Sequence, residues 1–275
     1  MKQGKALKHN IGIAKWYNDE LQAMCKKMQD DTLKGIKPLY ADYIAQDSAF
    51  DITVELKKLR DKYVEYFYKY GKQLSKKFIE RSVKYANISV KKALEPIAKK
   101  ELKFALKGSI INDSNRDIVK MAIFNNVSYI RSIPEEYFKD ITGAVTRSME
   151  FGGSIASLQK EIEHTYGVTQ RRAKLIAYDQ TRKVYSDLSL QKMKDAGFTK
   201  VKWVHSNAGE VPRCFHVHKW DGHSEPPNGL NGYIFDINNP PVIQKAKGKR
   251  EEVRGFPAQL INCRCFLVPV EDDEI

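Results

Sequence analysis

Hydrophobic residues recur at helical spacing through the first two-thirds of the chain. The clearest case is residues 51–87, where apolar side chains return every three or four positions along one helical face. Asp51 is a suitable capping residue for the start of this helix. Further helical patterns cover about residues 11–46, 89–107 and 114–130. The N-terminal part of the chain is therefore predicted to be mostly helical.

The helical pattern continues beyond residue 131 with new start signals. Ser132-Ile133-Pro134-Glu135 offers a capping serine, a proline in the first turn and a glutamate that can accept a free backbone N–H. Ser154 is expected to cap a short helix that Gly167 closes. A long helix is predicted over about residues 169–196, with Gly197 in the left-handed position that ends it.

The period changes from helical to alternating after Gly197. Residues 200–205 alternate between polar and apolar and predict a strand, and Tyr233-Ile234-Phe235 and Cys265–Val270 are further strand candidates. The polar, basic stretch Lys245–Arg254 is expected to be an exposed loop. The sequence thus predicts an α+β fold, in which a mostly helical N-terminal region precedes a small domain of mixed helix and antiparallel strands.

These patterns suggest three parts. Residues 1–131 form the helical N-terminal region, residues 132–270 form the mixed domain, and residues 271–275 form an acidic tail that we expect to be disordered. The sequence has no run of about 18 apolar residues that could span a bilayer, and its first residues lack a secretory signal. We expect no membrane partner, and we expect folding in the cytosol of the producing cell.

Positive charge is concentrated in the helical region. Residues 1–130 carry 26 Lys and Arg against 15 Asp and Glu, whereas the remaining residues carry 21 against 19. Such a field attracts nucleic acid through counterion release, without reading its sequence. The alternative is that these lysines only solvate the helices. The candidate DNA-binding residues are Lys57, Lys58, Lys69, Lys72, Lys76 and Lys77.

A cluster of aromatic residues lies within this helix. The cluster could stack on bases, but its helical spacing favours a packed seam between helices, with the tyrosine hydroxyls at its edge. Its members are Tyr63, Tyr66, Phe67, Tyr68 and Tyr70.

A set of short motifs follows in fixed order along the C-terminal half. Asp179-Gln180 lies in the long helix, Trp203 in the strand after it, and Asp221-Gly222 follows a stretch with Arg213 and histidines. A loop rich in Pro and Gly leads to Asn262-Cys263-Arg264-Cys265, which opens the terminal strand. This order, over about residues 132–270, resembles the phage minor head (head-morphogenesis) proteins typified by the F protein of phage Mu.

The resemblance implies a structural role in a virion. Members of that family are low-copy components near the portal, linked to head assembly and to packaging or ejection of the genome. The expected partners are therefore the portal protein and packaged DNA, with scaffolding or major capsid protein as further candidates. The expected location is the head interior near the portal, after assembly in the host cytoplasm, and no enzymatic activity is expected.

Soft and imidazole ligands gather in two groups of the C-terminal half. Cys214, His216 and His218 form one group, and Cys263 and Cys265 form the other, so four of them could hold a zinc ion. Cys-x-Cys in a strand also places both side chains on one face, where they could be simple buried residues with Arg264 opposite. A disulfide from Cys214 to either of them is a third reading.

A metal-dependent nuclease or virion-delivered effector is the alternative function. The residues that would carry metal-assisted water activation are His205, His216, His218, Asp221 and His223. The sequence contains no familiar His-Asn-His or paired-carboxylate pattern that would favour this reading.

Overall fold

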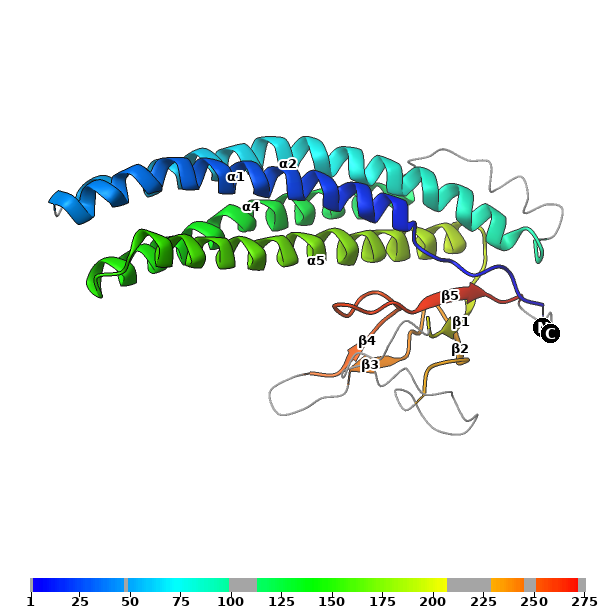
Figure 1. Cartoon of the computed structure of the whole chain (residues 1–275). Coiled ribbons are helices and arrows are strands. Elements are labelled where there is room, and N and C mark those ends of the chain that lie inside the picture. The colour runs from blue at the N-terminus through cyan, green and yellow to red at the C-terminus, as the bar shows by residue number, and fades with distance from the viewer. Residues whose placement is uncertain (1, 47–48, 99–112, 207–228, 245–250, 272–275) are drawn as a thin grey trace. The chain divides into compact units, whose positions relative to one another are not determined.

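The computed structural model describes residues 2–46, 49–98, 113–206, 229–244 and 251–271. In this part of the chain, long helices precede short antiparallel strands, which confirms the α+β prediction (Figure 1). The helices are α1 (Ile11–Gln46), α2 (Ala49–Leu94), α4 (Asp113–Glu150) and α5 (Ile155–Asp195). The strands are β1 (Lys200–Val204), β2 (Ile234–Asp236), β3 (Val242–Gln244), β4 (Val253–Arg254) and β5 (Phe266–Pro269). No helix among the described residues has the length and apolar character needed to cross a membrane.

The predicted helix start at Ser132 is wrong, because α4 passes through it without a break. Pro134 lies inside this helix and cannot donate the backbone hydrogen bond to the carbonyl of Ile130. Ile133 and Tyr137 are both buried on the inner side of the helix, so packing outweighs the lost bond. The Ser132 hydroxyl donates to the Tyr129 carbonyl at 2.8 Å and does not act as a cap.

The predicted break near Gly167 is also wrong, because α5 is one continuous helix. Thr169 does not cap a new helix; its hydroxyl donates to the Thr165 carbonyl at 2.9 Å. The two ends of α5 follow the prediction. Ser154 Oγ accepts from the Ser157 N–H at 3.1 Å, and Gly197 has a φ of +76°.

The chain divides into two compact units, and α2, α4 and α5 contribute to both. Unit 1 comprises residues 1–13, 79–121 and 179–275, and unit 2 comprises residues 14–78 and 122–178. The predicted boundary at residue 131 stays a prediction.

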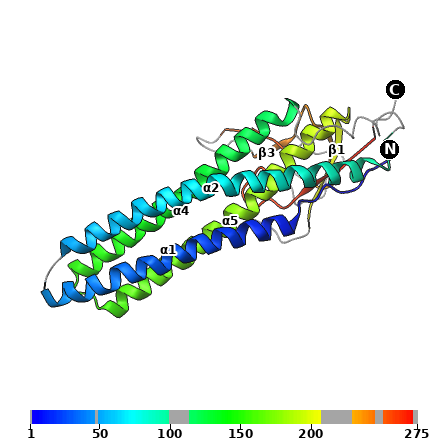
Figure 2. The same cartoon turned by 90° about the horizontal axis from the view of Figure 1, so that it is seen from above.

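Unit 2 is a bundle of four helical segments that run alongside one another (Figure 2). Its core contains the predicted aromatic seam. Tyr63 and Phe67 are fully buried, and the Tyr63 ring lies 6.2 Å from that of Phe138 on α4. Tyr17 of α1 stacks on Phe78 of α2 with ring centroids 4.4 Å apart. Packing between helices therefore occupies Tyr63 and Phe67, as the spacing predicted. The prediction is wrong for Tyr68 and Tyr70, which are exposed.

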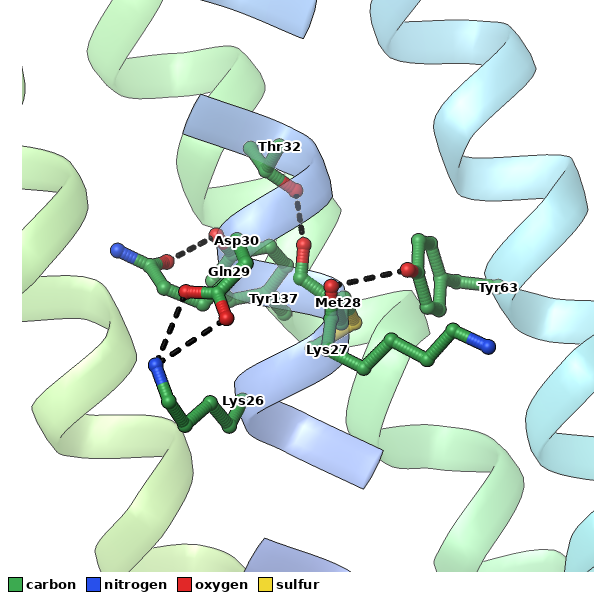
Figure 3. A network of polar contacts seen from close by, with 8 residues as sticks. All are labelled: Lys26, Lys27, Met28, Gln29, Asp30, Thr32, Tyr63 and Tyr137. Carbon is green, nitrogen blue, oxygen red and sulfur yellow. Dashed lines mark hydrogen bonds and ion pairs between the residues drawn. The ribbon is translucent and has the colours of Figure 1, made fainter. Parts of the chain in front are cut away.

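Buried polar groups fix α1 against its neighbours within unit 2 (Figure 3). The Tyr137 hydroxyl of α4 donates to Gln29 Oε1 at 2.5 Å, and the Tyr63 hydroxyl of α2 donates to the Lys27 carbonyl at 2.9 Å. Burial raises the pKa of both tyrosines, so they stay protonated donors. A buried group that lost its partner would cost about 1–3 kcal/mol, so these bonds favour one register of α1.

Unit 1 contains the strands. β1 lies at the centre of an antiparallel sheet in the order β2-β1-β5, with Val201 opposite Phe235 on one side and Trp203 opposite Leu267 on the other. β3 and β4 form a separate two-stranded sheet. The loop expected over Lys245–Arg254 therefore ends in a strand, because Val253 and Arg254 pair with β3 although both are exposed. Residues 245–250 lie outside the described residues.

Two glycines inside unit 2 helices differ in the space around them, which predicts opposite effects of alanine. A Cβ at Gly71 would lie 2.8 Å from Ile130 Cγ2, whereas the nearest atom to a Cβ at Gly167 is 3.9 Å away. We expect Gly71→Ala to lower the free energy of unfolding by about 1–3 kcal/mol through overpacking. We expect Gly167→Ala to raise it by up to about 1 kcal/mol through helix propensity. Urea denaturation measures both; a stabilising Gly71→Ala would contradict the packing described.

Candidate functional site

The first motif of the C-terminal half contacts the last one. Asp179 of α5 is 6% exposed and accepts a hydrogen bond from the backbone N–H of Asn262 at 3.3 Å. The same carboxylate forms an ion pair with Lys183, one helical turn further along α5, at 2.8 Å. Burying a carboxylate without such partners would be costly. The Asp179 side chain therefore links α5 to the Asn-Cys-Arg-Cys segment.

The type of residue at position 262 follows from its backbone. Asn262 has a φ of +64°, a left-handed conformation that asparagine adopts more readily than most residues. Its N–H points to Asp179 while the chain turns into β5, and the Cys263 N–H closes the turn on the Leu260 carbonyl at 3.0 Å. The asparagine of the motif is thus explained by turn geometry, without any ligand.

Trp203 links the second motif to the same closing strand. It lies on β1, is 1% exposed, and is paired with Leu267 of β5. Its ring centroid lies 6.3 Å from that of Phe235 on β2, so the tryptophan has a neighbour on each of the two strands beside β1. This position favours a structural role for Trp203.

The cysteines of the closing segment alternate as predicted. Cys263 and Cys265 are buried and Arg264 is exposed. No group of three or more potential metal ligands occurs among the described residues. Cys214, His216, His218, Asp221 and Gly222 lie outside the described residues. The zinc site and the disulfide therefore stay predictions, as does the position of the Asp-Gly turn.

The nuclease alternative rests on residues that lie mostly outside the described part of the chain. Of its five candidates, the structure describes His205, whose backbone N–H donates to Asn231 Oδ1 at 3.1 Å just after β1. This contact fixes the end of the strand. The absence of enzymatic activity stays a prediction.

The N-terminal arm is a part of this site that the sequence analysis missed. Residues 2–7 run antiparallel to β5, with Gln3 opposite Val270 and Leu7 opposite Leu267. The Leu7 N–H donates to the Leu267 carbonyl at 2.8 Å. The segment has one large apolar residue and no alternation, so periodicity gave no signal for a strand.

A glycine lets the arm fit closely against α2. A Cβ at Gly4 would lie 2.3 Å from the carbonyl oxygen of Ala93, and the Lys5 N–H donates to that same oxygen at 2.9 Å. Any larger residue at position 4 would displace the backbone. The arm therefore covers the edge of β5 that would otherwise expose unpaired backbone groups.

A small pocket lies between the arm, α5 and the closing segment. His9, Arg182, Ser186 and Cys265 are among the residues that line it. Burial, aided by repulsion from the Arg182 guanidinium, lowers the pKa of His9 to about 4. His9 is therefore neutral at physiological pH. On α5, the helix that carries Arg182, burial raises the pKa of Asp187 to about 6, and the charge of Lys183 opposes this increase.

The structure describes all the candidate DNA-binding lysines. All six are exposed on α2 within unit 2. Lys69 pairs with Glu65 at 2.9 Å. The other five form no ion pair with the described residues: Lys57, Lys58, Lys72, Lys76 and Lys77.

Comparison with known proteins covers nearly the whole chain. Residues 139–268 match the family model described as "Phage Mu protein F like protein". A protein of Haemophilus influenzae, described as uncharacterized, is 24% identical over 264 residues, which are 94% of this chain and 53% of that protein. The chain thus spans about half the length of this relative. No solved structure matches the chain.

The depressed pKa of His9 predicts a pH-dependent contribution to stability. Between pH about 4 and 6.5 the unfolded state protonates His9 and the folded state does not, so acid favours unfolding. The wild type should lose about 1–2 kcal/mol relative to His9→Gln as the pH falls through this range, given the partial exposure of the side chain.

Denaturation of both proteins at each pH measures this difference. The comparison is needed because Asp187 has the opposite effect: its raised pKa makes the folded state bind the extra proton between about 4 and 6. That contribution is common to wild type and variant and cancels. A difference that stays constant from pH 7 to 4 would show that His9 is not buried as described.

Proposed function

Since residues 139–268 belong to the phage Mu protein F-like family, as the motifs predicted, we propose that the chain is a minor protein of a phage head. The family is related to the phage head, and its virion location follows at that level. The finer proposal is a low-copy component of the head interior that binds the portal and packaged DNA. In this role the chain is not an enzyme, and it acts in head assembly and in packaging or ejection of the genome.

The observation that supports contact with DNA is the exposed face of α2. Between Lys57 and Lys77 this helix carries eight Lys or Arg and two acidic residues, and all ten side chains are exposed. Lys58, Lys72 and Lys76 recur at multiples of about 3.6 residues and lie on one face. At 1.5 Å per residue they extend over about 27 Å, which is long enough to follow several phosphates of a duplex.

The lysines of this face do not favour reading of the DNA sequence. Tyr63 and Phe67 are committed to the bundle core, where they cannot stack on bases, whereas Tyr68 and Tyr70 are exposed on α2. The exposed lysines are flexible point charges that suit phosphates. The binding proposed is therefore electrostatic and independent of sequence, as suits a protein in contact with packaged genome.

Neutralising this face should weaken binding and its dependence on salt together. We expect Lys58→Gln/Lys72→Gln/Lys76→Gln to reduce the slope of log K against log salt by about three, one for each phosphate contact. Fluorescence anisotropy with a random-sequence duplex at several salt concentrations measures the slope.

A matched control has the same net charge. Lys139→Gln/Lys160→Gln/Lys174→Gln removes three exposed lysines from α4 and α5 of the same unit and should leave the slope within about one of wild type. Equal losses in both triple variants would indicate an effect of net charge only. An unchanged slope in the α2 variant would contradict the DNA-binding face.

The head location has its own experiment. Purified heads of the phage that encodes the chain should contain it at a few copies per portal ring, and isolated portal rings should retain it through gel filtration. Quantitative immunoblotting against a dilution series gives the copy number. Heads that contain no detectable protein, while the portal and capsid proteins are present, would overturn the proposed function.

A further inference from the structure

One end of the unit 2 bundle carries an apolar groove. Residues Leu33, Lys34, Lys37, Pro38 and Ala41 of α1 line it together with Ile155 at the start of α5. Most of its surface comes from carbon atoms, and Pro38 and Ala41 are exposed. An apolar surface that is left open in a folded unit commonly marks a place where another molecule binds.

The turn between α4 and α5, at the same end of α5, exposes a large aromatic side chain. Phe151 is 83% exposed, although the backbone around it is well fixed. The Tyr40 hydroxyl donates to the Gly153 carbonyl at 3.0 Å and lies 2.5 Å from Ser148 Oγ. The Gly153 N–H donates to the Ser148 carbonyl at 2.7 Å. Phe151 is therefore held outward by an ordered turn and contributes nothing to the core.

The charge at the groove favours one class of occupant. Lys34 and Lys37 are both exposed, and neither forms an ion pair with the described residues. Two acids lie near these lysines. Asp31 of α1 pairs with Lys62 of α2 at 2.6 Å, and Lys34 contributes to lowering its pKa. Glu55 of α2 lies beside Gly35, where its Oε1 would be 3.1 Å from an added Cβ. Apolar walls with two lysines complement a segment that has an apolar side chain flanked by carboxylates.

Pro38 changes the backbone hydrogen bonding of α1 beside the groove. Pro38 lies inside α1 and has no N–H, so the carbonyl of Lys34 lacks the donor that it would have in an uninterrupted helix. The groove thus combines apolar and charged side chains over about two turns of α1.

We propose that this groove, together with Phe151, docks an acidic segment of a neighbouring head protein. One apolar side chain of the segment fills the groove, and its carboxylates pair with Lys34 and Lys37. This inference rests on the proposed function, because it assigns the partner to the assembled head. It is separate from the DNA-binding face of α2, whose lysines lie elsewhere in the sequence.

Incorporation into heads tests the groove. We expect Lys34→Glu/Lys37→Glu and Phe151→Ser each to reduce the copy number in purified heads by about tenfold, because charge reversal repels the acidic segment and the serine removes an anchor. Lys139→Glu/Lys174→Glu and Phe124→Ser are matched controls at exposed positions of the same unit, since Phe124 is 69% exposed. Both controls should be incorporated at the wild-type level. Thermal melting of all purified variants confirms that they fold.

A photo-crosslinking amino acid at position 155 identifies the occupant. The expected product joins the chain to a peptide of another head protein in which acidic residues flank an apolar one. Crosslinks confined to this chain, crosslinks to a segment without acids, or no crosslink at all would overturn the inference. Incorporation of the groove variants at the wild-type level would also overturn the inference, but it would leave the proposed function standing. Absence of the wild-type protein from heads would instead overturn the proposed function and the docking site together.

Discussion

The buried carboxylate of Asp179 is the interaction on which the arrangement of the C-terminal half depends. It lies on the long helix, has the Lys183 ammonium beside it, and receives the N–H of Asn262 at the turn before the last strand. A charge in this position is tolerated only while both partners stay in place. The left-handed backbone at Asn262 lies at that turn, and the two buried cysteines and the pairing of β5 with β1 come directly after it.

The sequence predicted those parts of the fold in which a local pattern and a tertiary requirement agree. The long apolar face of α2, the cap at Ser154 and the left-handed glycine at 197 are of this kind. It failed where local signals for a helix start or end were overruled. Pro134 and Gly167 interrupt nothing, because buried residues on both sides hold the helix through them. A strong capping or start signal therefore does not by itself predict a helix boundary. The apolar face of the helix must also be interrupted there.

The residues of the candidate site could be predicted from the sequence better than the contacts that bring them together. Asp179, Trp203 and Asn262 could be chosen from their order along the chain, and the structure shows that contacts within the fold account for each of them. The N-terminal arm could not be predicted, because its pairing depends on main-chain atoms and on the close fit of Gly4 against Ala93. Residue patterns report side-chain preferences, and this edge of the sheet is held by the backbone.

The arm also limits how such a gene can recombine. Its first residues complete a sheet whose other strands lie some 200 positions later, and they rest on a helix outside the family-matched segment. A crossover near residue 139 would combine β5 from one parent with the N-terminal arm, and its Gly4, from the other parent. Viable mosaics should therefore inherit the beginning and the end of the chain from the same ancestor, even where the intervening helices are exchanged.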